Sequence, residues 1–177
     1  PSIQNFAFTP SSIVTTDDFS LSYVYNDDDG DAEVDFEVLW ELNSAPFSYA
    51  ENSLMIPSTF TEKGQTWSAK VRVHDGNEWS TWFNTPSITV QNSLPVTESI
   101  SLSLAVAKTT DNIALEYTMS DIDGDSPSNS QITWSRDGDV RPSLNGLAIL
   151  PSSSTTKGEL WTVEVRAGDG TGLSDTS

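Results

Sequence analysis

Two runs of alternating carboxylates are the residues of this sequence best suited to chemistry. Each run sets three aspartates two positions apart around one glycine: Asp27, Asp29 and Asp31 around Gly30, and Asp121, Asp123 and Asp125 around Gly124. Hard cations such as Ca²⁺ prefer oxygen ligands, and a glycine permits the sharp bend that brings alternate carboxylates together. The pattern therefore predicts a Ca²⁺ site in each run. The alternative is that these residues only form turns, in which Asp side chains accept hydrogen bonds from neighbouring N–H groups.

The two predicted metal loops are not EF-hands. Their glycine is displaced, and Val38 and Ile132 stand where the twelfth residue of an EF-hand loop is a glutamate. Further carboxylates occur at Asp75 and Asp169, each directly before a glycine. These turns can add ligands where the fold brings them to the same end of a domain as the aspartate runs.

No catalytic constellation is recognisable in the sequence. His74 is the only histidine, and the chain has no cysteine. A Ser-His-Asp triad, a Cys nucleophile and a Cys-ligated zinc site therefore have no support. Paired carboxylates are too common in an acidic protein to single out a glycosidase pair, and no glycine-rich phosphate loop is present. We predict no catalytic residues and no enzymatic activity.

The aspartate runs belong to a repeat that governs the whole chain. Residues match at a spacing of 94 without insertion or deletion. The matched pairs include Tyr23 with Tyr117, Trp40 with Trp134, Pro57 with Pro151, Trp67 with Trp161, and Asp75 with Asp169. A period of this length suits a small β-sandwich domain of ~100 residues. We predict two domains, residues 1–92 and residues 93–177, joined at a short linker.

Alternation of apolar and polar residues predicts strands in both domains. The clearest runs cover residues 19–25, 34–42 and 67–73, with 113–119 and 161–167 at equivalent positions. Short strands of this kind, separated by turn signals, predict an all-β fold of two tandem Ig-like Greek-key β-sandwiches. Trp40 and Trp134 are predicted to fill the two cores.

The second domain is predicted to lack its last strand. Residues 84–91 end the first domain with a plausible final strand, whereas Ser177 is the equivalent of Phe83. A sandwich without that strand exposes a sheet edge, which natural proteins rarely leave bare. Two alternatives stay open: the native chain continues beyond Ser177, or a neighbouring subunit supplies the strand by β-augmentation, as in a filament.

The net charge of -18 bears on partners and location. Such a surface repels nucleic acid and anionic lipid, so we expect neither as a partner. No stretch approaches the ~20 apolar residues of a membrane span, which predicts no membrane insertion in this segment. Absence of cysteine does not argue against secretion.

Several aromatic residues do not repeat between the domains. The first domain has aromatic residues at five positions where the second has none: Phe47, Tyr49, Trp79, Trp82 and Phe83 align with Arg141, Ser143, Leu173, Thr176 and Ser177. Since a core requirement is shared by both copies, the last three of these aromatics, Trp79, Trp82 and Phe83, are the predicted interaction patch. The alternatives are packing of the last hairpin, a subunit contact and a sugar-stacking platform.

The succession of motifs resembles tandem Ig-like repeats related to polycystic-kidney-disease-type and bacterial cadherin-like modules of prokaryotic surface proteins. It runs Leu-Ser-Tyr-Val-Tyr-Asn-Asp-Asp-Asp-Gly-Asp over 21–31, Lys-Gly-Gln-Thr-Trp over 63–67 and Val-Arg-Val-His-Asp-Gly over 71–76, repeated over 115–125, 157–161 and 165–170. The resemblance implies a non-catalytic extracellular structural or adhesive module of a stalk, adhesin or filament. Its partners would be neighbouring repeats, identical subunits or a cell-surface glycan. The alternative function is a carbohydrate-binding accessory module of a secreted enzyme.

Overall fold

The computed structural model describes residues 1–176, and contacts divide the chain into two compact units. Unit one is Pro1–Ser93 and unit two is Leu94–Ser177. Both units are built from strands joined by turns and single turns of 3₁₀-helix. Across the described residues, no helix has the length and apolar character needed to cross a membrane.

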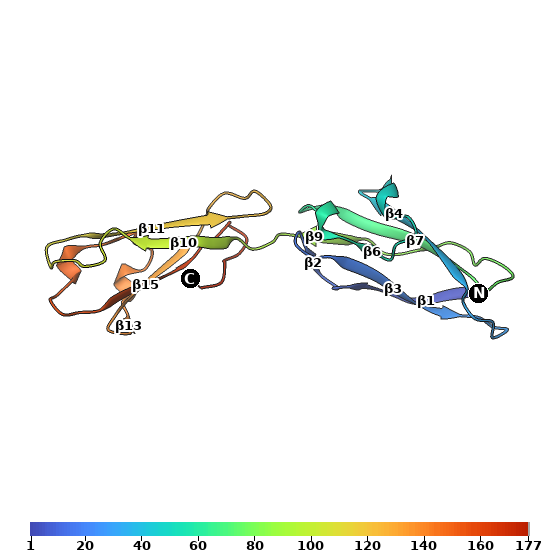
Figure 1. Cartoon of the computed structure of the whole chain (residues 1–177), viewed down its shortest axis with the longest axis horizontal. Coiled ribbons are helices and arrows are strands. Elements are labelled where there is room, and N and C mark those ends of the chain that lie inside the picture. The colour runs from blue at the N-terminus through green and yellow to red at the C-terminus, as the bar shows by residue number, and fades with distance from the viewer. Residues whose placement is uncertain (177) are drawn as a thin grey trace. The chain divides into compact units, whose positions relative to one another are not determined.

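Unit one has two sheets packed as layers, visible in Figure 1. Its elements are β1 (Ser2–Thr9), β2 (Ile13–Val14), β3 (Phe19–Asn26), β4 (Asp35–Leu42), β5 (Ala45–Phe47), η1 (Ser48–Ala50), β6 (Met55–Ile56), η2 (Ser58–Phe60), β7 (Thr66–His74), β8 (Phe83–Asn84) and β9 (Ile88–Gln91). One sheet has the order β1-β3-β6. The other has the order β2-β9-β7-β4-β5, and β8 also pairs with β7.

Unit two repeats this plan with fewer strands. Its elements are β10 (Val96–Leu102), β11 (Ile113–Ser120), β12 (Gln131–Arg136), β13 (Asp139–Val140), η3 (Pro142–Leu144), β14 (Ile149–Leu150), η4 (Ser152–Ser154) and β15 (Trp161–Arg166). The sheets have the orders β10-β11-β14 and β13-β12-β15. The strand β15 corresponds to β7, but it lies at the edge of its sheet because the described residues include no counterpart of β9. The prediction of an all-β fold of two Ig-like sandwiches is confirmed.

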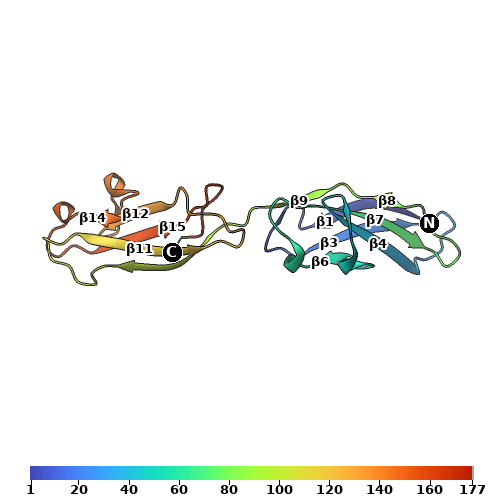
Figure 2. The ribbon, with the colours of Figure 1, turned by 90° about the horizontal axis from the view of Figure 1, so that it is seen from above.

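The alternation predicted for residues 67–73 holds along all of β7. Its inward residues are fully buried: Trp67, Ala69, Val71 and Val73. Its outward residues carry ion pairs to β4, which runs beside β7 in Figure 2. The Lys70 Nζ lies 2.7 Å from Glu41 Oε1, and the Arg72 guanidinium lies 2.6 Å from Glu37 Oε2. The period-2 pattern therefore sorts the core face from the solvent face.

Trp40 and Trp134 are core residues of equivalent strands, as predicted. Trp40 on β4 is 1% exposed and Trp134 on β12 is 0% exposed. Each indole N–H donates to a backbone carbonyl, Ser53 O at 2.7 Å and Leu147 O at 2.9 Å. Because the polar N–H is satisfied, each ring can be buried completely without an unpaired donor.

The N-terminus of unit one and its last strand, β9, lie at opposite ends of β7. The Pro1 ammonium lies 3.9 Å from Asp75 Oδ2, directly after the last residue of β7. At the other end of β7, Thr66 and Trp67 pair with Thr89 and Ile88 of β9. The nine residues of β7 separate the two ends by about 30 Å, at ~3.4 Å per residue.

Candidate metal centre and aromatic surface

The Asp121–Asp125 loop of unit two is organised by its first carboxylate. Asp121 Oδ1 accepts hydrogen bonds from the N–H groups of Asp123 at 2.8 Å and Asp125 at 3.3 Å. This is the turn-forming role considered as an alternative from the sequence. The second oxygen, Asp121 Oδ2, is buried and has no hydrogen-bond partner among residues 1–176. Asp121 Oδ1 therefore shapes the loop, and Asp121 Oδ2 is available to bind a ligand such as a cation.

Asp169 brings a third carboxylate close to those of Asp121 and Asp125. One ligand oxygen each from Asp121, Asp125 and Asp169 lie within 4.8 Å of one another. Asp169 Oδ1 shapes its own turn by accepting from Thr171 N–H at 2.6 Å and Gly172 N–H at 2.7 Å. The structure thus joins Asp121 and Asp125 to Asp169, and Asp123 is not a member of this trio.

Unit one has the same turn but a different neighbour. Asp27 Oδ1 accepts from the N–H groups of Asp29 at 2.9 Å and Asp31 at 3.2 Å. Asp27 Oδ2 lies 3.0 Å from the Pro1 ammonium. Asp29 and Asp31 are exposed. Asp27 Oδ2 therefore has a positively charged partner, whereas the equivalent Asp121 Oδ2 has no hydrogen-bond partner within residues 1–176.

The pKa values in unit one follow from these contacts. Hydrogen bonding to the Pro1 ammonium, helped by the N–H groups of Asp31 and Asp29, lowers the pKa of Asp27. The N–H groups of Glu78 and Asn77 lower the pKa of Asp75. Both carboxylates are consequently held in the charged form that the loop geometry requires.

The donor set of unit two fits a hard divalent cation. Oxygens bound to one Ca²⁺ at about 2.3–2.6 Å lie at most ~5 Å apart, and the trio satisfies this limit. Three carboxylates without a cation repel one another, and Asp121 Oδ2 has no donor within the described residues. Backbone carbonyls and water would complete the six to eight ligands that Ca²⁺ takes.

The predicted interaction patch is organised by an arginine that the sequence analysis missed. The Arg72 guanidinium carbon lies 4.6 Å from the Trp79 ring centroid and 4.7 Å from the Trp82 ring centroid. Both rings therefore stack on one cation from β7. Trp82 is 36% exposed, whereas Phe83 is partly buried and lies 6.2 Å from the Phe6 ring. The signal was present in the period of β7, which points Arg72 outward.

In unit two, the arginine equivalent to Arg72 makes a hydrogen bond to the backbone and has no tryptophan at the positions of Trp79 and Trp82. Arg166 corresponds to Arg72, and its Nε donates to Ser174 O at 2.9 Å. Ser174 Oγ in turn accepts from Ala167 N–H at 2.9 Å, as Ser80 Oγ accepts from Val73 N–H at 3.1 Å. The hairpin is thus common to both units, and the tryptophan pair is particular to unit one.

Comparison with known proteins finds only distant structural likenesses. No family model matches the chain, and no curated protein matches it. Similar solved structures include a segment of two fibronectin type-III domains from chicken tenascin, with a TM-score of 0.41, 13% identity and coverage of 100% of this chain and 97% of that chain. Another is the chicken interferon gamma receptor alpha chain, with a TM-score of 0.47, 9% identity and coverage of 100% and 95%.

Proposed function

We propose that the chain is a non-catalytic structural or adhesive module of an extracellular surface assembly, such as a stalk, adhesin or filament. The observation that carries the proposal is the separation of chain entry and exit at opposite ends of β7 in unit one. A domain with this geometry adds its full length to a chain of repeats. The motif resemblance to polycystic-kidney-disease-type and bacterial cadherin-like repeats agrees with this role.

The pairing of β2 with β9 suits a module under tension. These strands are parallel, with Ile13 opposite Val90 and Val14 opposite Gln91. Along the chain, β2 lies near the beginning of unit one and β9 lies at its end. A pull on both ends therefore slides β2 and β9 past each other, and their contacts must break together instead of one at a time.

Single-molecule force spectroscopy tests this proposal. A tether at both ends of the full chain is expected to give two unfolding events, each lengthening the chain by roughly 280 Å at about 3.3–3.6 Å per residue. The matched variant carries Ile13→Ala and Val14→Lys, the residues that unit two has at these positions. It should lower the force of one event only. Unfolding of both units at negligible force, or no effect of the variant, would contradict a mechanical role.

A Ca²⁺ ion held by Asp121, Asp125 and Asp169 forms part of this proposal for unit two. The support is the spacing of the trio together with the buried Asp121 Oδ2. The ion would neutralise the three carboxylates and tie the Asp121–Asp125 loop to the turn after β15. The triplet Asp27, Asp29 and Asp31 of unit one stays a prediction.

The second candidate function is a carbohydrate-binding accessory module. Exposure of Trp82 and of Tyr49, which is 82% exposed and stacks on Phe60 at 5.8 Å, favours it. Aromatic faces of this kind can stack on sugar rings. Glycan-array binding that disappears in Trp82→Ala would support this candidate, and an array without signal would remove it.

A further inference from the structure

The basic residues of unit one gather on one face of one sheet. Unit one has 14 acidic residues and only three basic ones, Lys63, Lys70 and Arg72. Lys70 and Arg72 both point outward from β7, because the residues between them and on either side of them are buried. Two of the three positive charges of this acidic unit therefore lie side by side on the outer face of β7.

The strand β4 provides a row of negative charge directly beside them. Its outward residues include Asp35, Glu37 and Glu41, which alternate with residues that face the core. The two strands run side by side in Figure 2, and their register sets Glu37 opposite Arg72. The outer β4–β7 face thus nearly balances its charges, whereas the rest of unit one is strongly acidic.

The charged side chains of this face are held in fixed positions. Arg72 Nε and Nη2 lie 2.7 Å and 2.6 Å from the same oxygen, Glu37 Oε2. Lys70 Nζ lies 2.7 Å from Glu41 Oε1. The Arg72 guanidinium is also stacked on the rings of Trp79 and Trp82. Such side chains lose little conformational freedom when a partner binds, so the face is preorganised for contact.

The central ion pair has one unused group on each side. Within residues 1–176, Glu37 Oε1 accepts no hydrogen bond and Arg72 Nη1 donates none. The Glu37 side chain is 34% exposed and the Arg72 side chain is 30% exposed. Two apolar residues of the same surface are also exposed, Leu39 by 44% and Trp82 by 36%. The face therefore offers a free acceptor, a free donor and apolar area to one partner.

The two charge rows are complementary to themselves. A rotation by 180° about an axis that is parallel to the strands and lies between β4 and β7 sets β4 of one copy over β7 of the other. The rotation keeps the level along the strands, so the register pairs Glu37 of each copy with Arg72 of the other. At the next level it sets Leu39 against the aliphatic stem of Lys70.

We infer that two copies of the chain associate through the outer β4–β7 face of unit one. A second copy brings both rows in exchanged order, which makes it the partner that this pattern of charge fits. Other faces of unit one would bring like charges together. The inference deepens the proposed structural role by naming a partner. It rests on that role only for its purpose, because the force needed to unfold a single chain does not depend on dimerisation.

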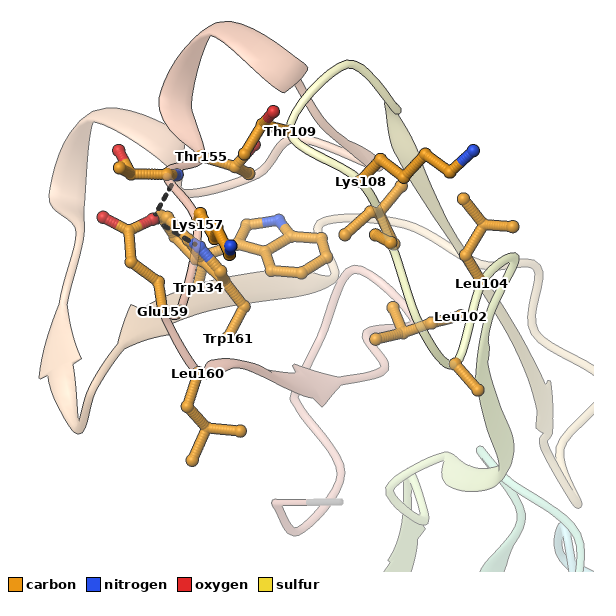
Figure 3. A pocket seen from close by; sticks show the side chains of 15 residues that line it. Leu102, Leu104, Lys108, Thr109, Trp134, Thr155, Lys157, Glu159, Leu160 and Trp161 are labelled. Carbon is orange, nitrogen blue, oxygen red and sulfur yellow. Dashed lines mark hydrogen bonds between the residues drawn. The ribbon is translucent and has the colours of Figure 1, made fainter.

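Unit two does not repeat this face. It has Gln131, Thr133 and Ser135 at the positions of Glu37, Leu39 and Glu41, and Glu164 at the position of Lys70. Two of its lysines, Lys108 and Lys157, instead line the open groove shown in Figure 3. Unit two therefore supplies a matched control for charge changes in unit one.

Sedimentation velocity of the full chain over a range of concentrations tests the inference. The unmodified chain should form dimers at about 0.15 M salt, where contacts between nearby charges persist. Glu37→Arg and Arg72→Glu should each weaken the dimer by about tenfold or more, because like charges then meet at both cross contacts. An equimolar mixture of the two variants should dimerise again, since each variant supplies the charge that the other lacks.

Two controls separate this dimer from other effects. Arg166→Glu, the equivalent change in unit two, should leave dimerisation intact. In the unmodified chain, iodide quenching of Trp82 should decrease as the dimer forms, a readout that needs no variant to fold. A chain that stays monomeric, a dimer that both variants leave unchanged, or variants that do not rescue each other would overturn the inference. A monomer that binds a glycan through Trp82 would overturn it as well.

Discussion

Trp161 stands at the position of Trp67, yet Trp67 is 0% exposed and Trp161 is partly exposed. The two indoles make the same bond, to Gln65 Oε1 in one unit and to Glu159 Oε2 in the other. Local geometry is thus conserved between the repeats, and the difference comes from β9, whose Ile88 pairs with Trp67. Burial of this ring therefore reports on whether a strand covers the edge.

Truncation of the core tryptophans is expected to be severe in both units. Trp40→Ala and Trp134→Ala each remove a fully buried ring and should cost about 3–5 kcal/mol of unfolding free energy. Denaturant unfolding followed by near-UV circular dichroism measures this. Trp82→Ala is the control, because Trp82 is 36% exposed, and it should cost about 1 kcal/mol or less. Equal effects of core and surface variants would refute the core assignment.

The regular parts of the fold were predictable from the sequence because a buried face imposes a period. The alternation in β4 and β7 and the two core tryptophans carried that information. The start of β4 could not be predicted in this way. Val34 belongs to the predicted run, but it lies before the strand and is 62% exposed. An apolar side chain at a strand end has no fixed partner in the pattern, so periodicity cannot assign it.

The units differ in how acid affects one hydrogen bond. Asp18 Oδ1 accepts from the Ser58 N–H at 2.7 Å, and this bond lowers the pKa of Asp18 below its ordinary value of 3.8. Charged Asp18 therefore stabilises unit one at neutral pH, and this contribution is lost as pH falls below that value through the folded-state pKa. Asp18→Asn should flatten this loss in melting curves recorded from about pH 2 to 7.

Unit two supplies the matched control for this acid effect. Asn112 Oδ1 accepts from the Ser152 N–H at 2.8 Å with no charge to titrate. Asn112→Asp should consequently introduce into unit two the acid sensitivity that Asp18→Asn removes from unit one. If both variants keep the pH dependence of melting seen in the unmodified chain, this hydrogen bond does not contribute to the acid sensitivity of stability.

Calcium is expected to stabilise unit two selectively. Binding to the folded state raises its stability by mass action, so about 1 mM Ca²⁺, the range bound by extracellular modules, should raise the melting temperature of unit two. Asp169→Asn should abolish the shift, because Asp169 belongs to the trio. Asp75→Asn, the equivalent change in unit one, should leave it intact. A shift that survives Asp169→Asn would place the ion elsewhere.

The arginine between the tryptophans is expected to stabilise the surface of unit one modestly. Arg72→Ala removes two cation–π contacts, each worth about 0.5–1 kcal/mol at an exposed site, and the ion pair to Glu37. Trp82 should become more accessible to a fluorescence quencher such as iodide. Arg166→Ala in unit two is the control, since within residues 1–176 no tryptophan stacks on Arg166. Unchanged quenching would contradict the stacking.

The candidate sites were harder to predict than the core. The aspartate triplets contain two members of the trio, Asp121 and Asp125, but the spacing of side chains in sequence could not separate Asp123 from Asp125. That choice depends on which carboxylate the turn directs toward Asp169, some 44 positions later in the chain. Likewise, the sequence marked Trp79 and Trp82 as unusual, while their shared contact with Arg72 arises only when β7 and the following hairpin fold together.

The parallel pair of β2 with β9 has a consequence for synthesis of the chain. The ribosome makes Ile13 and Val14 early, and their partners Val90 and Gln91 come almost eighty residues later. Unit one can therefore complete its second sheet only when its last strand has left the exit tunnel. Until that moment the nascent chain holds Ile13 and Trp67 without their cover, and a chaperone that recognises exposed apolar segments has its longest opportunity there.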